Sequence, residues 1–202
     1  MVEGLSPRKI AAVDLDGTLI GANSLHLYIR AGLRHASLWG KMRILALLAL
    51  RRMRIISHRR MKFGVLGIIN PCDELKADFV ASVKAFERPA VKELLEKLRG
   101  QGITILLATA ASDIYIPWIW DGDFVATRTR DNNERRECRG ELKAEAVRNY
   151  MHHGDILEVV ITDHTDDIPL LKTGARINLL VEPSQSTLKK LNSSNISFEI
   201  LS

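Results

Sequence analysis

The chain has 202 residues, of which 46% are hydrophobic and 26% charged, and its formal net charge is +5. This balance is ordinary for a globular protein with one substantial core, or with one core and a small accessory domain. No apolar run approaches the roughly 20 residues of a membrane-spanning helix, and the opening MVEGLSPRKI lacks the long apolar segment of a secretory signal. Cys72 and Cys138 are too few for a disulfide framework, so we expect a reduced, cytoplasmic protein.

The charges are unevenly distributed along the chain. Between Gly17 and Cys72 there is no Asp or Glu, but there are ten basic residues. These are Arg30, Arg34, Lys41, Arg43, Arg51, Arg52, Arg54, Arg59, Arg60 and Lys62. The rest of the chain holds the other 19 basic residues and all 24 acidic ones, a balance of −5. Two regions of opposite charge indicate two structural units.

The first predicted element is a short buried strand at residues 10–13, where four apolar residues with β-branched ends follow one another. From about residue 24 to about residue 86, the apolar positions recur at helical spacing, and no segment convincingly predicts a strand. Residues 88–102 then predict a helix, with Pro89 near its first turn and Gly100 and Gly102 past its end.

Strands and helices alternate along the rest of the chain. In order, we expect a strand at 103–109, a helix at 140–154, a strand at 157–163, a short helix at 167–174 and a strand at 175–181. This alternation is typical of a parallel sheet with helices on both faces, and predicts a doubly wound, Rossmann-like α/β fold. Residues 1–20 and 88–202 are therefore expected to form an α/β core, and residues 21–87 an inserted helical unit.

Two carboxylates stand directly after the first predicted strand. A buried strand that ends in paired like charges, here Asp14 and Asp16, is costly unless something cationic meets them. Thr109 follows the second predicted strand and Asp163 the third, and ligands of such sheets bind outside the carboxyl ends of the strands. The sequence therefore predicts an active site at this rim. The alternative is a solvated, Asp-rich turn.

Four segments in order resemble the motifs of a known family. DLDGT, LLATAAS, GELKAEAV and ITDHTDDIPLL are similar to the four motifs of the haloacid dehalogenase superfamily. The resemblance is closest to the phosphoserine-phosphatase-like branch, in which a helical cap is inserted between the first and second motifs. It covers about residues 8–20 and 88–191, whereas residues 21–87 match only in position and helical character.

The resemblance implies the roles of the first and third motifs. Asp14 would be the nucleophile that attacks phosphorus and forms an aspartyl-phosphate intermediate. Asp16 would protonate the leaving oxygen and later activate the hydrolytic water, since neighbouring carboxylates raise one another's pKa. Gly17 would let the backbone turn sharply beside the phosphate. Lys143 would neutralise charge on the transferring phosphoryl group and on Asp14.

The second motif would bind the phosphoryl group through neutral donors. Thr109 would donate its hydroxyl to a phosphoryl oxygen, with help from the backbone N–H groups of Ala110 and Ala111. Ser112 is the alternative hydroxyl.

The resemblance also implies a magnesium site, because hard cations prefer oxygen ligands. Asp14, the backbone carbonyl of Asp16, Asp163 and Asp167 would hold Mg²⁺. Asp166 is either a helper or a bystander, and His164 departs from the small residue that the family usually has there. The alternative is that these aspartates cap a helix that starts near residue 168.

The predicted function is Mg²⁺-dependent hydrolysis of a phosphate monoester. The alternative is a catalytically idle phosphate-binding or regulatory protein that retains the fold. The substrate would be a small-molecule or lipid-linked phosphate ester. The basic segment RRMRIISHRR lacks interleaved aromatics, so no nucleic-acid partner is predicted. The oligomeric state is left open.

The segment LWGKMRILALLALRRMRII joins apolar residues to basic flanks, and two interpretations fit it. In the first, the basic cap attracts a strongly anionic substrate or makes peripheral contact with an anionic membrane. In the second, the segment is an ordinary helix with a solvated basic face, and its apolar residues pack against the core.

Overall fold

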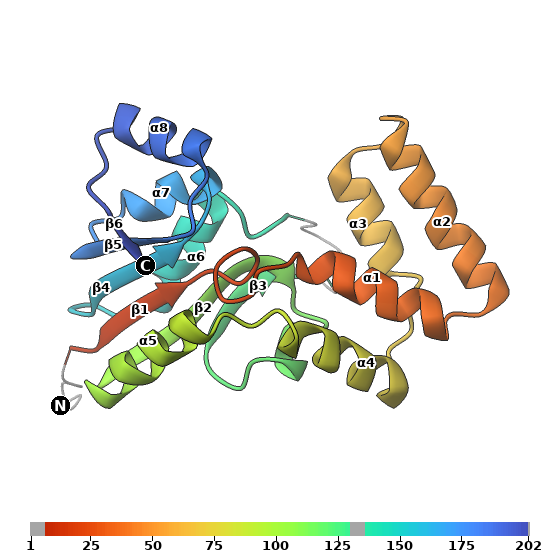
Figure 1. The fold of residues 1–202 in the computed structure, drawn as a ribbon, viewed down its shortest axis with the longest axis horizontal. Coiled ribbons are helices and arrows are strands. Elements are labelled where there is room, and N and C mark those ends of the chain that lie inside the picture. Colours follow the sequence, from red (N-terminus) through yellow and green to blue (C-terminus); the bar gives the residue numbers. More distant parts are fainter. Residues whose placement is uncertain (1–6, 130–135, 202) are drawn as a thin grey trace.

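The protein, seen in a computed structural model that describes residues 7–129 and 136–201, is built on a six-stranded sheet in the order β3-β2-β1-β4-β5-β6 (Figure 1). The strands are β1 (Lys9–Val13), β2 (Ile103–Ser112), β3 (Phe124–Thr127), β4 (Ile156–Thr162), β5 (Ile177–Val181) and β6 (Glu199–Leu201). All five strand pairings are parallel, which confirms the predicted doubly wound α/β fold.

Helices cover both faces of the sheet. The core helices are α5 (Pro89–Gly100), α6 (Glu141–Tyr150), α7 (Ile168–Leu171) and α8 (Gln185–Ser193). Alternate residues of β1 belong to different apolar clusters: Ala11 and Val13 pack with residues of α5, and Ile10 and Ala12 pack with residues of α6, α7 and α8. Because β1 is buried on both sides, its sequence reads as an uninterrupted apolar run rather than an alternating one.

Four further helices lie between β1 and α5. They are α1 (Ser24–His35), α2 (Leu38–Arg52), α3 (His58–Leu66) and α4 (Asp73–Lys84). The two connections to the core run side by side, because Gly21 N donates to Phe86 O at 2.8 Å and Arg88 N to Leu19 O at 3.0 Å. We call α1–α4 the cap, and α2 is its helix farthest from the sheet (Figure 1). Among the described residues, no helix combines the length and the apolar character needed to span a bilayer.

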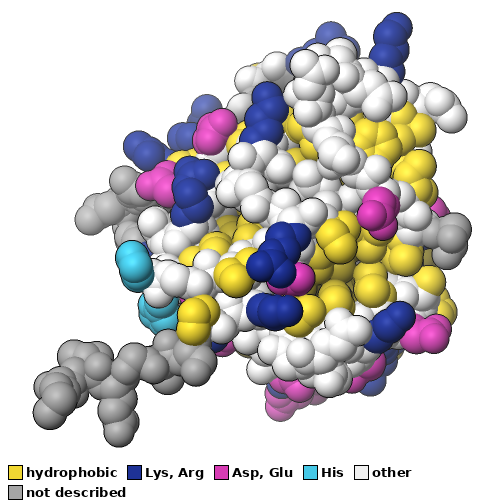
Figure 2. Space-filling model, turned by 90° about the vertical axis from the view of Figure 1, so that its left-hand side faces the viewer, with side chains coloured by type: hydrophobic (Ala, Val, Ile, Leu, Met, Phe, Trp, Pro, Cys, Tyr) yellow, Lys and Arg dark blue, Asp and Glu magenta, His cyan; other side chains and the backbone are white. Residues whose placement is uncertain are grey.

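The cap is attached to the core by an aromatic cluster. The ring of Tyr28 in α1 stacks on Tyr115, with centroids 4.8 Å apart, and meets Phe79 of α4 edge-on at 5.6 Å. Tyr115 and Trp118 belong to the segment after β2, so this cluster joins cap and core in one hydrophobic unit. On the side of the molecule farthest from the cap, hydrophobic side chains lie among both acidic and basic ones (Figure 2).

The sequence does not predict three of the elements that the structure contains. The edge strands β3 and β6 have only four and three residues, too few for a hydrophobic pattern to identify them, and helix α8 was also missed. Strand β2 also continues to Ser112, three residues beyond the predicted end. In contrast, α6 ends at Tyr150 rather than at 154, because Met151 adopts an extended conformation.

An ion pair joins the beginnings of β1 and β4. Arg8 donates from its backbone N to Asp155 Oδ1 at 2.9 Å and from Nη2 to Oδ2 at 2.6 Å, and His152 N also donates to this carboxylate. These hydrogen bonds, with that to the Arg8 side chain the strongest, hold the pKa of Asp155 well below its usual range.

We expect Asp155→Asn to lower the midpoint of thermal unfolding by a few degrees at neutral pH. Because the pKa of Asp155 is depressed in the folded state, its contribution is complete above the unfolded pKa of about 3.9 and is lost as the pH falls further. The difference between wild type and variant should therefore narrow below about pH 4. Glu96→Gln, in the exposed pair with Arg99, is the matched control and should have little effect. Equal midpoints for wild type and Asp155→Asn at pH 7 would contradict the prediction.

Candidate active site

A pocket of about 460 Å³ opens between the cap and the carboxyl ends of β1, β2 and β4. The core contributes residues from all four sequence motifs, and the cap, together with Asn23 just before α1, contributes Leu25 and several polar or basic residues. The core residues are Asp14, Asp16, Thr109, Ala110, Ala111, Tyr115, Glu137, Arg139, Lys143, Asp163, His164, Asp166 and Asp167, and the cap residues are Asn23, Leu25, Arg51, His58 and Lys62. The predicted site residues from four distant segments are thus gathered in one place.

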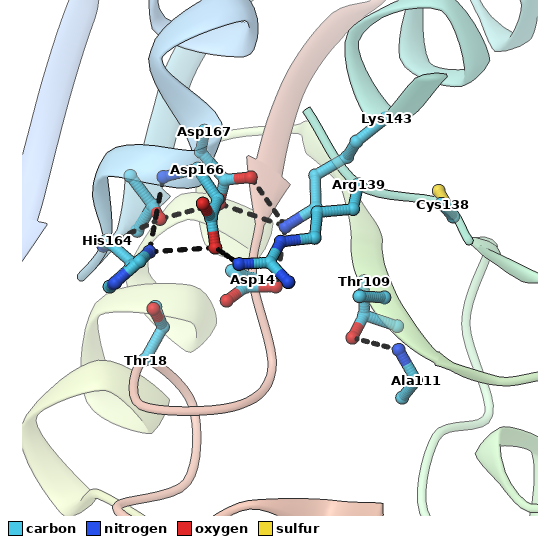
Figure 3. Close-up of polar contacts among 12 residues, drawn as sticks. Asp14, Thr18, Thr109, Ala111, Cys138, Arg139, Lys143, His164, Asp166 and Asp167 are labelled. Carbon is cyan, nitrogen blue, oxygen red and sulfur yellow. Dashed lines mark hydrogen bonds and ion pairs between the residues drawn. The ribbon is translucent and has the colours of Figure 1, made fainter. Parts of the chain in front are cut away.

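Asp14 forms a connected set of charges with the buried residues Lys143 and Asp167 (Figure 3). Lys143 lies in the first turn of α6, and its Nζ donates to Asp14 Oδ1 at 2.8 Å and to Asp167 Oδ2 at 2.9 Å. Thr162 Oγ1 at the end of β4 donates to the same Asp167 oxygen at 2.7 Å. Burial alone lowers the pKa of Lys143, but the two carboxylates outweigh it and raise this pKa above its ordinary value. Lys143 is therefore a fixed cation, held between the first and fourth motifs.

The six carboxylates that line the pocket outnumber its two buried lysines, Lys143 and Lys62. Burial raises the pKa of Asp14 to about 7, against the lowering effect of Lys143. Burial also raises the pKa values of Asp16 and Asp163 above their ordinary range. The structure thus identifies desolvation, rather than carboxylate neighbours alone, as the main cause of the raised pKa of Asp16. Asp16 Oδ1 accepts a 2.8 Å hydrogen bond from Ser24 N, which fixes this carboxylate at the start of α1.

Gly17 allows the loop after β1 to approach the end of β4. Its φ is +86°, and a Cβ on it would lie 2.2 Å from Asp163 Oδ2, so a side chain would have to displace the carboxylate. Next to it, Thr18 Oγ1 donates to Asp163 Oδ1 at 3.2 Å. The glycine is thus required for two reasons, its left-handed backbone and the close packing of the Asp163 carboxylate.

The second motif presents Thr109 rather than Ser112 to the pocket. Thr109 is buried at the pocket wall, and its Oγ1 accepts a hydrogen bond from Ala111 N at 3.0 Å, which leaves the hydroxyl proton available for donation. The Ala111 N–H, which the sequence assigned to the phosphoryl group, is therefore bonded to Thr109. Ser112 does not line the pocket, and its hydroxyl is bonded to Thr129.

Asp166 and His164 lie at the rim of the pocket. The Asp166 carboxylate pairs with Arg139, and His164 lies beside it, with its Nδ1 2.9 Å from Asp166 Oδ2 (Figure 3). These contacts differ from those expected if the aspartates of the fourth motif served to cap the helix that starts near residue 168. Asp167 stands at the N-cap position of α7 but makes no capping bond with its side chain, and His164 accepts from Asp166 N in the preceding turn.

Lys62 of α3 is the functional candidate that the sequence did not single out. Only 3% of it is exposed, and its Nζ donates to Ala110 O at 2.7 Å and to Glu137 Oε1 at 2.8 Å. It therefore connects the cap to the second motif inside the pocket. In the sequence it is one of ten basic residues without an acidic neighbour, so no local signal distinguished it from the solvated ones.

The pocket offers a partly built site for a divalent cation. Within residues 7–129 and 136–201, no group of three His, Cys, Asp or Glu side chains could hold a metal ion. Mg²⁺, however, usually takes one or two protein carboxylates and completes its shell with water and phosphate oxygens. Asp163 sits in the space that Gly17 leaves open, beside a pocket with excess acidic charge. The buried Asp167 Oδ1 has no hydrogen-bond partner among the described residues, although Lys143 Nζ lies 2.8 Å from it. This oxygen-rich donor set fits Mg²⁺.

The chain matches a protein family over most of its length. Residues 11–172 match the family described as haloacid dehalogenase-like hydrolase. No curated protein matches the chain.

Solved structures with the same fold cover nearly the whole chain. One is a protein with unknown function from Bordetella pertussis Tohama I, with 17% sequence identity and a TM-score of 0.75, covering 98% of this chain and 99% of that one. A second is a phosphoserine phosphohydrolase-like protein from Francisella tularensis subsp. tularensis SCHU S4, with 19% identity and a TM-score of 0.53, covering 93% and 99%. A third is phosphoserine phosphatase in its apo form, with 14% identity and a TM-score of 0.61, covering 91% and 90%. At these identities, the similarity concerns the fold.

Proposed function

The chain belongs to the haloacid dehalogenase-like hydrolases, and we propose that it is a phosphatase that hydrolyses a small-molecule or lipid-linked phosphate monoester through an aspartyl-phosphate intermediate. The observation that carries the proposal is the contact of Lys143 with Asp14 at the carboxyl end of β1, in a pocket that also contains Asp16 and Thr109. A nucleophile, a second carboxylate, a hydroxyl donor and a fixed cation are the groups that phosphoryl transfer through an aspartate requires.

Asp14 is proposed as the nucleophile. In the reaction, one of its carboxylate oxygens would form a bond to phosphorus while the bond from phosphorus to the ester oxygen breaks. Its other oxygen can remain bonded to Lys143, which holds the carboxylate in position. Water would then attack the phosphoryl group and release phosphate, and Asp14 would be regenerated.

Asp16 is proposed as the general acid and base. Burial raises its pKa, which favours the protonated form that a general acid needs. Asp16 would give that proton to the leaving ester oxygen and later accept one from the attacking water. The hydrogen bond from Ser24 N keeps one carboxylate oxygen directed toward α1 and thereby orients the other.

Thr109 and Lys143 are proposed to bind the phosphoryl group. The Thr109 hydroxyl can donate to one phosphoryl oxygen, and the Lys143 ammonium can offset the negative charge that Asp14 and the phosphoryl group bring together. The backbone of Ala110 would line the same space, and Gly17 would let the loop after β1 pass close to Asp163 beside it.

We further propose that Asp14, the backbone carbonyl of Asp16, Asp163 and Asp167 hold Mg²⁺. Because no three of these side chains among the described residues are already placed to hold a metal ion, the cation would have to draw at least one carboxylate inward when it binds. When bound, the cation would supply positive charge that lowers the repulsion between the phosphate ester and the acidic pocket. Asp167 would also position Lys143, because its carboxylate accepts a hydrogen bond from the Lys143 ammonium.

The proposal is tested by assaying the purified protein against a panel of phosphate monoesters, with and without Mg²⁺. Release of inorganic phosphate from at least one ester would support a phosphatase. Phosphate binding without release from any ester would instead support an idle phosphate-binding protein.

We expect chelation of divalent cations to lower turnover at least tenfold, and added Mg²⁺ to restore it. The physical reason is that the pocket holds more carboxylates than buried cations, so the phosphate ester enters against net repulsion. Ca²⁺ should restore activity poorly, because it prefers a larger and looser ligand shell. The measurement is phosphate release as a function of each cation after chelation. Full activity in excess chelator would refute the metal requirement.

A further inference from the structure

The outer helix of the cap has an unusually apolar surface. Of the nine large hydrophobic residues that are most exposed in the described chain, six lie between positions 38 and 55. They are Leu38, Trp39, Met42, Leu45, Met53 and Ile55. Trp39 is 67% exposed, Met42 54% and Leu45 55%, whereas Ile44 is the buried residue of α2. We call α2 together with the turn through Ile55 the cap surface.

The apolar residues of the cap surface form a stripe. Leu38, Met42 and Leu45 are separated by four and three positions, the spacing that places side chains on one face of a helix. Met53 and Ile55 continue the apolar surface into the turn that leads to α3. Burying these residues in water-free surroundings would be favourable, so the stripe is a candidate contact surface.

The charged residues near this stripe in the sequence are all basic. Arg43, Arg52 and Arg54 are exposed, and none of the ion pairs found within residues 7–129 and 136–201 involves them. No Asp or Glu occurs between Gly17 and Cys72, so the sequence around the stripe carries no acidic charge. The hydrophobic surface on the opposite side of the molecule differs, because acidic and basic side chains are mixed there (Figure 2).

We propose that the cap surface docks on a bilayer that contains anionic lipid. An apolar helical face with basic residues and no acidic ones is suited to the boundary between headgroups and acyl chains. The basic residues would gain from the negative surface potential, while Trp39 occupies the interface that tryptophan favours. A second copy of this chain is a poorer occupant, because it would bring two basic surfaces together.

Docking of the cap surface would also fix where the pocket lies relative to the bilayer. Helix α2 lies at the outer edge of the cap (Figure 1), and Arg51 near its end also lines the pocket. The apolar turn residues Met53 and Ile55 follow directly in the chain. Arg51 is nine positions after Met42, about half a turn around the helix, so docking through the stripe would leave the pocket on the face of α2 turned away from the bilayer, about one helix diameter from the headgroups. The docking itself does not depend on the proposed phosphatase activity, and its test uses no activity readout.

The test is sedimentation of the full chain with vesicles of phosphatidylcholine alone or mixed with an equal part of phosphatidylglycerol. We expect binding to the mixed vesicles, weakened by salt, and little binding to phosphatidylcholine alone. Replacing Arg43, Arg52 and Arg54 by Gln should weaken binding roughly a hundredfold, since each basic residue contributes near an anionic surface. The matched control replaces Lys172, Lys189 and Lys190, which are exposed on the core, and should leave binding unchanged.

A second pair of variants tests the apolar part. The double variant Met42→Gln and Leu45→Gln should bind weakly, whereas Ile177→Gln and Ile200→Gln, at exposed positions of the core, should bind like wild type. Trp39 also reports on insertion, because its fluorescence should shift to shorter wavelength on the mixed vesicles. Trp39→Phe should keep most of the binding and lose the shift. Thermal midpoints near that of wild type would show that the variants fold.

Three results would overturn the proposal. The first is an absence of binding to the mixed vesicles at low salt. The second is binding that neither cap variant weakens. The third is self-association in solution that Met42→Gln and Leu45→Gln abolish, which would assign the cap surface to an interface between copies.

Discussion

Asp14→Asn is expected to lower turnover of a generic aryl phosphate by at least about a thousandfold while leaving the fold intact. The asparagine amide is close in shape to the carboxylate but is not a nucleophile, so the covalent step is lost. The other groups of the pocket remain in place, because Lys143 keeps its ion pair with Asp167. Turnover by phosphate release and the midpoint of thermal unfolding are the two measurements.

The control for Asp14→Asn is the same chemical change at an exposed position. Asp73, at the start of α4, is exposed and does not line the pocket, so Asp73→Asn should retain wild-type turnover. If Asp14→Asn kept near-wild-type turnover, Asp14 would not be the nucleophile. A large fall in the unfolding midpoint would instead show that the loss of activity has a structural cause.

The parts of the fold that the sequence predicted are those with strong local patterns. Residues 10–13 and 103–109 are continuous apolar runs because their strands are buried on both faces, and Pro89 begins a helix whose amphipathic spacing is clear. The edge strand β3 has three half-buried residues out of four, so its composition does not differ from that of a loop. Its strand conformation is determined by pairing with β2, a contact between distant segments.

The residues of the candidate site also divide into those that the sequence predicts and those that it does not. Asp14, Thr109, Lys143 and Asp163 were identified because each stands at a fixed place in an ordered motif, and the structure places all four around one pocket. Lys62 could not be identified, because its partners Ala110 and Glu137 lie 48 and 75 positions away. A buried lysine is recognisable only once its acceptors are known, since an isolated lysine in a basic segment looks solvated.

The pairing of Asp167 with Lys143 could not be read from the sequence either. The fourth motif suggested a metal ligand, but the side chain also contacts the lysine of the third motif at both carboxylate oxygens. Such a contact depends on how α6 packs above the end of β4. It follows from the tertiary structure rather than from any spacing within a motif.

Lys143→Met is expected to reduce turnover roughly a hundred- to a thousandfold, and also to destabilise the protein. The loss of activity follows because the phosphoryl group and Asp14 would then meet without a fixed cation between them. The loss of stability follows because Asp14 and Asp167 would be left as buried carboxylates without their counter-charge, a change that typically costs about 3–5 kcal/mol. Because Met is similar to Lys in length and is apolar, packing should change little.

A double variant separates these two effects of Lys143. Adding Asp167→Asn to Lys143→Met removes one of the two buried charges that lost their partner, so much of the free energy of unfolding should return. Turnover should stay low, because the cation that offsets the phosphoryl charge is still missing. The measurements are chemical denaturation and phosphate release for the wild type, the two single variants and the double variant. Recovery of turnover along with stability in the double variant would mean that Lys143 serves only to balance buried charge, and its proposed role at the phosphoryl group would have to be abandoned.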